Sequence, residues 1–102
     1  MYTYSTPTLP VEITGIDYTD VLFFRIAIRQ ADLKLVKTVD ADDPMVDAEH
    51  ETVYVPLTQE ETACFKDGKV QIQARIKFSN GAVMPTNKAT LSVEEVLDEV
   101  II

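Results

Sequence analysis

Residues 69–78 alternate between polar and apolar side chains without interruption, and this pattern constrains the fold more than any other feature of the chain. The apolar set is Val70, Ile72, Ala74, Ile76 and Phe78. The polar set that follows Lys69 is Gln71, Gln73, Arg75 and Lys77. Successive side chains of a β-strand point to opposite faces, so a period of two predicts a strand with one buried face. Such a strand needs a second apolar surface to cover it.

Five further segments have the alternation or the composition of strands: residues 8–14, 21–30, 33–39, 52–57 and 82–94. The segment 21–30 is rich in β-branched and aromatic residues, which favours a central strand over a helix. Its expected core residues are Leu22, Phe24, Ile26 and Ile28. The segment 82–94 is expected to be broken near Met84-Pro85, and its expected inward residues are Ala89, Leu91 and Val93. The dipeptide Asn80-Gly81 predicts a tight hairpin before this last strand.

One short helical turn is expected near residues 59–65. The tetrapeptide Thr58-Gln59-Glu60-Glu61 has the form of a capping box, in which the threonine side chain and the glutamate satisfy each other's backbone amides. Gly68 follows, and glycine readily adopts the positive φ at which such a turn ends.

The predicted fold class is all-β, specifically an immunoglobulin-like antiparallel β-sandwich of six to seven strands. Periodicity leaves a small β-barrel open as the alternative. A chain of 102 residues has the size of one domain, so we expect residues 1–102 to share one core.

The net charge of −8 disfavours binding to phosphate backbones, which depends on lysine and arginine, so no nucleic-acid partner is expected. No apolar run approaches the roughly 18 residues of a membrane span, and the first residues lack the basic and apolar regions of a signal peptide. We therefore expect no membrane partner and no export by a signal peptide. The single cysteine, Cys64, excludes an internal disulfide and fits a reducing compartment.

An acidic segment, residues 40–51, holds the best candidates for metal binding. Asp40, Asp42 and Glu51 fall at positions 1, 3 and 12 of a frame like that of an EF-hand. Pro44 and Met45 occupy positions 5 and 6, where that frame needs an oxygen ligand and a glycine. A solvated acidic loop is therefore the expectation, with cation binding as the alternative.

No group of residues has the pattern of an active site, and we expect neither enzymatic activity nor a cofactor. His50 is the only histidine, and its one candidate partner in a catalytic pair is Cys64. No cysteine-enzyme motif surrounds either residue, and a cysteine on a short helix is usually a small buried apolar side chain. The pairs Glu60-Glu61 and Glu94-Glu95 are interpreted as helix capping and surface charge.

Two sets of residues are candidates for protein contacts. The first is the polar stripe Gln71, Gln73, Arg75 and Lys77, which Arg25, Arg29, Lys34 or Lys37 of neighbouring strands would extend. A basic patch of this kind on an acidic protein would suit the acidic loop of another subunit. The second is the apolar end of the chain, Val100, Ile101 and Ile102.

About two-thirds of the chain, residues 53–102 together with the upstream segment 23–30, resembles small β-sandwich proteins encoded by tailed phages and prophages of gut Firmicutes. The segments that carry the resemblance are Leu57–Thr62, Phe65–Gly68, Val70–Arg75, Asn80-Gly81 and Val93–Leu97. More loosely, the chain is similar to the immunoglobulin-like N-terminal domains of phage baseplate upper proteins. The resemblance implies a virion structural or assembly protein with no catalytic residues. Its partners would be other virion or assembly proteins and further copies of itself.

By the same resemblance the protein would be made in the cytoplasm of the bacterial host and then enter the virion. The alternative function is a β-sandwich binding module that uses the acidic segment 40–51 to hold a cation, a carbohydrate or a host protein.

Overall fold

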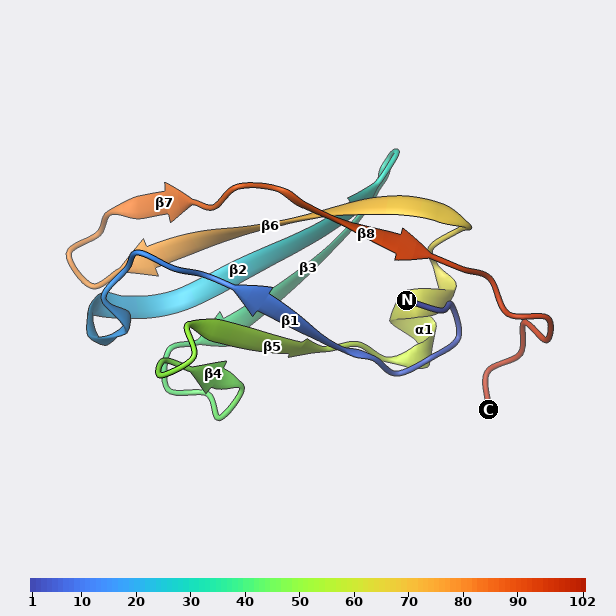
Figure 1. Ribbon diagram of the computed structural model, residues 1–102, viewed down its shortest axis with the longest axis horizontal. Helices are drawn as coiled ribbons and strands as arrows, with labels where there is room; N and C mark the ends of the chain where they lie inside the picture. The colour runs from blue at the N-terminus through green and yellow to red at the C-terminus, as the bar shows by residue number, and fades with distance from the viewer.

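The computed structural model describes residues 1–102 as two antiparallel β-sheets packed against each other (Figure 1). The larger sheet contains β2 (Val21–Gln30), β3 (Leu33–Asp40), β6 (Gly68–Phe78), β7 (Val83–Pro85) and β8 (Ala89–Val93). The smaller sheet contains β1 (Thr8–Glu12), β4 (Val46–Asp47) and β5 (Thr52–Pro56). A 3₁₀ turn, η1 (Tyr18–Asp20), leads into β2, and a short helix, α1 (Gln59–Ala63), connects the two sheets.

The predicted all-β sandwich is confirmed. The smaller sheet has the order β1-β5-β4, and the larger has the order β3-β2-β6, with β7 and β8 both paired to the far edge of β6. This is the immunoglobulin-like arrangement, with the extra edge strand of the variable type on the larger sheet. The chain forms two separate sheets and not the barrel that periodicity left open. Eight strands are present because the segment 82–94 divides into two and the acidic segment contains the two-residue β4.

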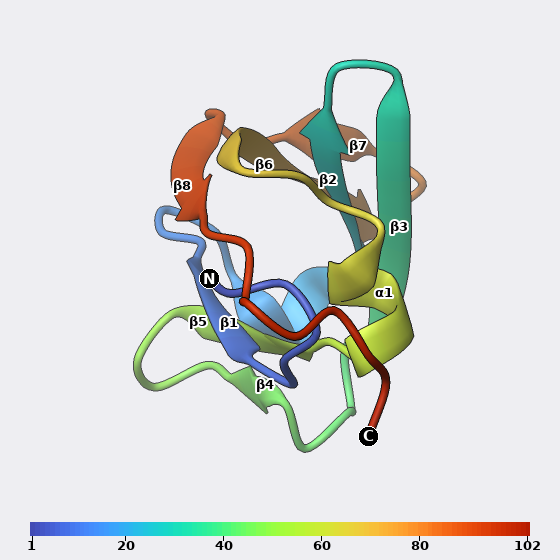
Figure 2. The same ribbon diagram turned by 90° about the vertical axis from the view of Figure 1, so that its right-hand side faces the viewer.

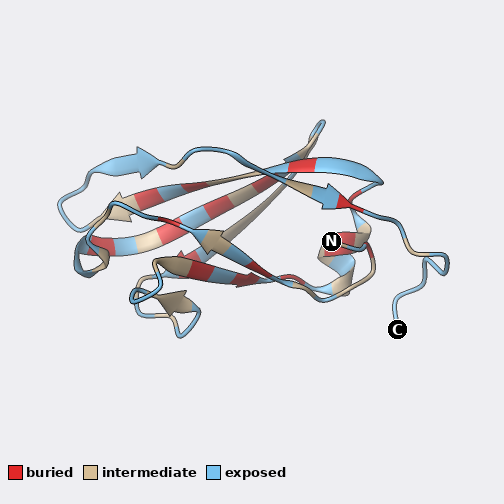
Figure 3. Cartoon of the chain, in the orientation of Figure 1, coloured by how far each residue is buried: buried red, intermediate tan, exposed pale blue.

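The core lies between the two sheets and follows the alternation in the sequence (Figure 3). Its fully buried residues include Phe24, Ile26 and Ile28 of β2, Val53 and Val55 of β5, and Val70, Ala74 and Ile76 of β6. At about 25 cal/mol per Å² of apolar surface removed from water, these side chains supply the main stabilising force of the fold. The prediction of a strand over residues 69–78 is therefore confirmed in its position and in which face is buried.

Leu22 does not face the core as predicted. The β2–β6 register shifts between Val21 and Phe23, and this bulge places Val21 in the core while Leu22 is 50% exposed. An extra residue in a strand reverses the alternation on one side of it, which strict periodicity cannot anticipate. Ala89 is also exposed, although Leu91 is half-buried and Val93 is buried as predicted.

The break between β7 and β8 is bridged by Thr86. Its amide donates to the carbonyl of Ala74 at 2.8 Å, and its hydroxyl accepts the amide of Ala74 at 3.1 Å. The backbone groups of β6 are therefore satisfied where no strand lies beside Ala74, so the edge stays ordered across the gap.

The capping box at α1 is confirmed. Thr58 Oγ1 accepts the amide of Glu61 at 3.2 Å, and Glu61 Oε1 accepts the amide of Thr58 at 2.9 Å. The helix ends at Ala63, two residues before the predicted end, and Phe65 beyond it is buried. The hydroxyl of the buried Thr62 donates to the carbonyl of Ser5 at 2.9 Å, which holds the first residues of the chain against α1.

Candidate interaction surface

The larger sheet presents a row of cations on the face that points away from the core. In the strand register, Arg25 of β2 lies directly opposite Arg75 of β6, and Arg29 of β2 lies directly opposite Lys34 of β3. Directly opposed residues of an antiparallel ladder project from the same face of the sheet. Six of the nine lysines and arginines gather here, on what we call the basic face: Arg25, Arg29, Lys34, Lys69, Arg75 and Lys77.

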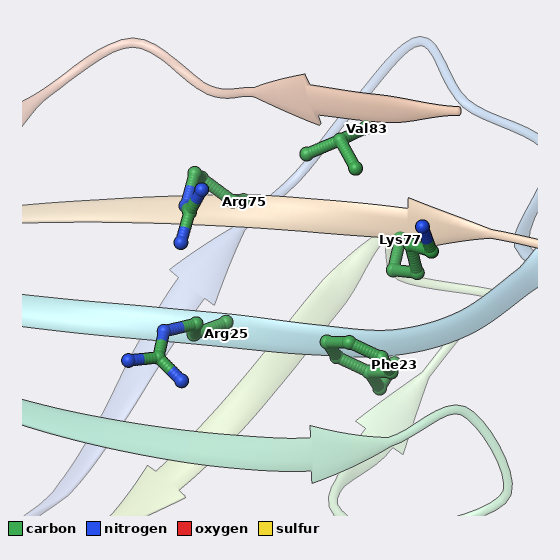
Figure 4. Close-up of a pocket in the computed structure, with 5 residues that line it drawn as sticks. All are labelled: Phe23, Arg25, Arg75, Lys77 and Val83. Carbon is green, nitrogen blue, oxygen red and sulfur yellow. The ribbon is translucent and has the colours of Figure 1, made fainter. Parts of the chain in front are cut away.

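Two shallow hollows lie along the basic face. The first, of about 330 Å³, is lined by Phe23, Arg25, Arg75, Lys77 and Val83, which come from β2, β6 and β7 (Figure 4). The second, of about 220 Å³, continues along the sheet and is lined by Ala27, Arg29, Lys34, Gln71, Gln73 and Lys88. No carboxylate lines either hollow, so both are positively charged.

The cations of the basic face have no acidic partners within the chain. The structure contains two ion pairs, Lys37 with Glu61 and His50 with Asp47, and both lie elsewhere. Arg29 Nε donates to the carbonyl of Ala31, and Lys77 Nζ donates to the carbonyl of Gly81. Like charges directly opposite each other destabilise a sheet. The pair Arg25–Arg75 therefore weakens the isolated fold, and an external anionic group would relieve it.

The four predicted residues of the stripe lie on this one face, but their side chains are not equally free. Gln71 and Arg75 are exposed, and Lys77 is half-buried. Gln73 Nε2 donates to the carbonyl of Thr86 at 2.8 Å, so this amide supports the break between β7 and β8. The stripe thus offers chiefly its cations and Gln71 to a partner.

Of the four cations considered as extensions of the stripe, three join it and one does not. Arg25, Arg29 and Lys34 lie on the basic face. Lys37 pairs with Ile26 in the ladder and so points to the opposite side, where its ammonium contacts Glu61 at 2.9 Å. Burial raises the pKa of Glu61, but hydrogen bonds from the Thr58 amide and from Lys37 outweigh burial, and the pKa lies below its ordinary value.

Five residues of the surface were not anticipated: Phe23, Ala27, Lys69, Val83 and Lys88. Lys88 lies in the β7–β8 connection and lines the second hollow in addition to the six strand cations of the basic face. Phe23 and Lys69 could have been found, because each shares the alternation of the arginines on its strand. Val83 reaches the face because the hairpin register places it opposite Lys77, and Lys88 because the chain crosses back beside β6. Neither register nor crossing is visible in local sequence.

The acidic segment forms hydrogen-bonded turns. Asp43 Oδ1 accepts the amide of Met45 at 2.8 Å, and Asp47 Oδ2 contacts His50 Nδ1 at 2.7 Å. The contact with His50 lowers the pKa of Asp47. Asp40, Asp42 and Glu51 are not gathered into a site, since no group of three or more His, Cys, Asp or Glu residues is placed to hold a metal ion. Cys64 is exposed and its thiol contacts the carbonyl of Glu60 at 3.3 Å, so the predicted burial of this thiol is wrong.

The opposite side of the sandwich is acidic. Glu12 of β1 and Asp47 of β4 both lie opposite Thr52 of β5, so the two carboxylates stand on either side of one residue on the outer face of the smaller sheet. Burial, with the nearby charges of Glu51, Asp47 and Glu12, raises the pKa of Tyr18 to about 12. We call this surface, with Glu12, Asp47 and Glu51, the acidic face.

The last three residues of the chain have exposed side chains and a backbone that is held in place at Ile102. Val100, Ile101 and Ile102 are all exposed, Ile102 at 96%. Gln59 holds the segment, because its amide group donates to the carbonyl of Ile102 at 2.6 Å and accepts the amide of Ile102 at 3.0 Å. The apolar side chains are therefore available while the backbone is fixed beside α1 (Figure 1).

Comparison with protein-family models, with curated proteins and with solved structures found no match. No helix of the structure combines the length and the apolar character that crossing a membrane would require.

Proposed function

We propose that this protein is a virion structural or assembly protein of the tailed-phage or prophage type, which acts through protein–protein contacts made by the basic face. The observation that carries the proposal is the opposed pair of Arg25 and Arg75, which has no anionic partner in a chain of net charge −8. The resemblance of the sequence to phage β-sandwich proteins indicates the biological setting.

The composition of the basic face suits a protein partner. Arginine and aromatic residues are enriched at protein interfaces, and the first hollow combines Arg25 and Arg75 with Phe23. Val83, which is 52% exposed, adds apolar surface beside them. A partner that inserts a carboxylate between the two guanidinium groups would form charge-assisted hydrogen bonds, which are stronger than neutral ones.

Nucleic acid is a poorer candidate for the same surface. A polyanion meets the field of the whole protein as it approaches, and here that field comes from 17 acidic and 9 basic side chains. An acidic protein surface presents fewer, localised charges, which the six cations can match. The partner that fits the basic face is therefore an acidic protein surface.

The test uses particles purified on a density gradient from the host that encodes the chain. We expect the wild-type protein to be found with particles or assembly intermediates, and the Arg75→Glu variant to remain in the unassembled fraction. Lys66→Glu is the matched control, because Lys66 is exposed, lies outside the basic face and undergoes the same change of charge. Absence of the wild-type chain from particles and intermediates, or equal behaviour of the two variants, would contradict the proposal.

A further inference from the structure

We propose that the partner of the basic face is the acidic face of a second copy of this chain, so that copies stack head to tail. This inference rests on the proposed function and adds the identity of the partner surface. It follows from the distribution of charge over the two sheets and from their opposite orientation.

Most charges are divided between the two sides of the sandwich, and Asp40, which lies opposite Phe23 at the end of β3, is the one carboxylate of the β2–β3 ladder on the outer face of the larger sheet. Residues 1–24 and 38–65, which include all of β1, β4 and β5, contain no lysine or arginine. The basic face, in turn, takes its six cations from β2, β3 and β6. One molecule therefore carries both halves of a complementary pair of surfaces, and a second copy supplies the missing carboxylates without any other partner.

The acidic face also has an apolar centre, and the hollow beside Arg25 has an apolar lining, Phe23 and Val83, for it to contact. Pro10 of β1 lies opposite Tyr54 of β5, and Thr8 lies opposite Pro56, so two prolines flank an exposed tyrosine ring. Glu12 and Asp47 lie next to this centre. An arginine of the basic face that lies over the Tyr54 ring gains a cation–π contact. The neighbouring cations of that face then lie beside the carboxylates of Glu12 and Asp47.

The direction of the two faces decides the symmetry of the contact. The sheets pack core to core, so their outer faces point away from each other (Figure 2). A two-fold dimer through the larger sheet would bring Arg25 and Arg75 against their own copies. A head-to-tail contact brings cations against carboxylates and leaves one basic and one acidic face free. Such a heterologous contact repeats, and it produces a ring or a filament.

Copies of net charge −8 repel each other at long range, so the contact depends on local complementarity. At roughly 0.1 M salt the Debye length is about 10 Å, which screens the overall repulsion more than the close charge pairs. We therefore expect association at moderate salt and its loss at high salt.

The test uses two variants that neutralise one face each. Arg25→Gln with Arg75→Gln disables the basic face, and Glu12→Gln with Asp47→Asn disables the acidic face. Sedimentation velocity over a concentration series should show species larger than a dimer for the wild-type chain. Each variant alone should associate at least about tenfold more weakly, as expected when close charge pairs are lost. Circular dichroism checks that both variants are folded.

The decisive sample is the equimolar mixture of the two variants. Each retains the face that the other needs, so the mixture should form a heterodimer and nothing larger. A mixture that stays monomeric, or variants that associate as the wild type does, would overturn the inference. So would a monomeric wild-type chain that binds single-stranded DNA through Arg25 and Arg75 at moderate salt. A monomer that still needs Arg75 to enter particles would contradict self-stacking alone and leave the proposed function standing.

Discussion

Arg25 and Arg75 occupy directly opposite positions on adjacent strands, and no carboxylate lies within ion-pair distance of either guanidinium group. In an isolated protein this arrangement is unfavourable, because the two charges repel each other on one face of the sheet. The fold tolerates the repulsion because the buried side of the same strands, with Phe24, Ile26 and Ile76, is fully packed. Stability and interaction are thus located on opposite faces of β2 and β6.

Replacing one arginine should make the isolated fold more stable. We expect Arg75→Gln to raise the free energy of unfolding by about 0.2–1 kcal/mol at low salt, since it removes the repulsion from Arg25. Urea denaturation at low and high salt measures the effect, which should shrink as salt screens the charges. Lys69→Gln is the control, because Lys69 lies opposite the uncharged Ser92. A destabilised Arg75→Gln variant would show that the pair is not repulsive.

The packing of β2 predicts very different effects at two nearby positions. Phe24 is fully buried, so Phe24→Ala should lower the free energy of unfolding by about 3–5 kcal/mol. Leu22, on the bulge, is half exposed, and Leu22→Ala should change it by no more than about 1 kcal/mol. Urea denaturation of both variants provides the comparison. Equal losses at the two sites would mean that the bulge is not formed in solution.

Local sequence was sufficient for those parts of the fold that depend on neighbouring residues. The alternation of residues 69–78 gave β6 and its buried face, because period-two burial leaves a direct mark on composition. The capping box at Thr58 gave the start of α1, because both of its partners lie within four residues. The polar stripe on β6 was predicted from the same alternation, because the residues between the buried positions share the opposite face.

Features that depend on strand register could not be read in this way. The bulge at Leu22 follows from the fit of β2 to β6, which are far apart in the sequence. The opposition of Arg25 and Arg75 follows from the same register, as does the departure of Lys37 to the inner side. The break after Pro85 was predicted, but the way in which Thr86 replaces a strand partner of Ala74 could not be. The stripe and the cations that extend it were therefore predicted, whereas the positions of these cations relative to each other follow only from the register.

The ion pair between Lys37 and Glu61 predicts a pH-dependent part of the stability. The pKa of Glu61 is lowered on folding, so its contribution is fully present above the unfolded value of about 4.3 and is lost as the pH falls through the folded value. Glu61→Gln keeps the capping box but removes the charge, and should cost less than about 1 kcal/mol at neutral pH. The free energy of unfolding, measured by urea denaturation from pH 7 to acid, should fall more steeply for the wild type than for Glu61→Gln. Parallel curves would contradict this assignment.

Tyr18 should be recognisable by its late titration. Burial first, and then the carboxylates of Glu51, Asp47 and Glu12, raise its pKa to about 12. The unfolded phenol ionises near pH 10, so the stability that Tyr18 contributes is present below that pH and decreases as the pH rises toward 12. Ultraviolet absorbance of the phenolate should show a step near pH 12 that Tyr18→Phe removes. A step that persists in this variant would assign it to another tyrosine.

The exposed apolar end should matter for contacts and not for folding. Val100, Ile101 and Ile102 are 57%, 44% and 96% exposed and lie outside the hydrophobic core, and of the three only the backbone of Ile102 is hydrogen-bonded, to Gln59. Removing residues 100–102 should therefore change the free energy of unfolding by no more than about 0.5 kcal/mol. If the segment is an interaction surface, as its composition predicts, the same deletion should reduce incorporation into particles. Gln59→Ala is the matched control, because it releases the segment without removing its side chains. A large loss of stability on deletion would show instead that these residues pack against the sandwich in solution.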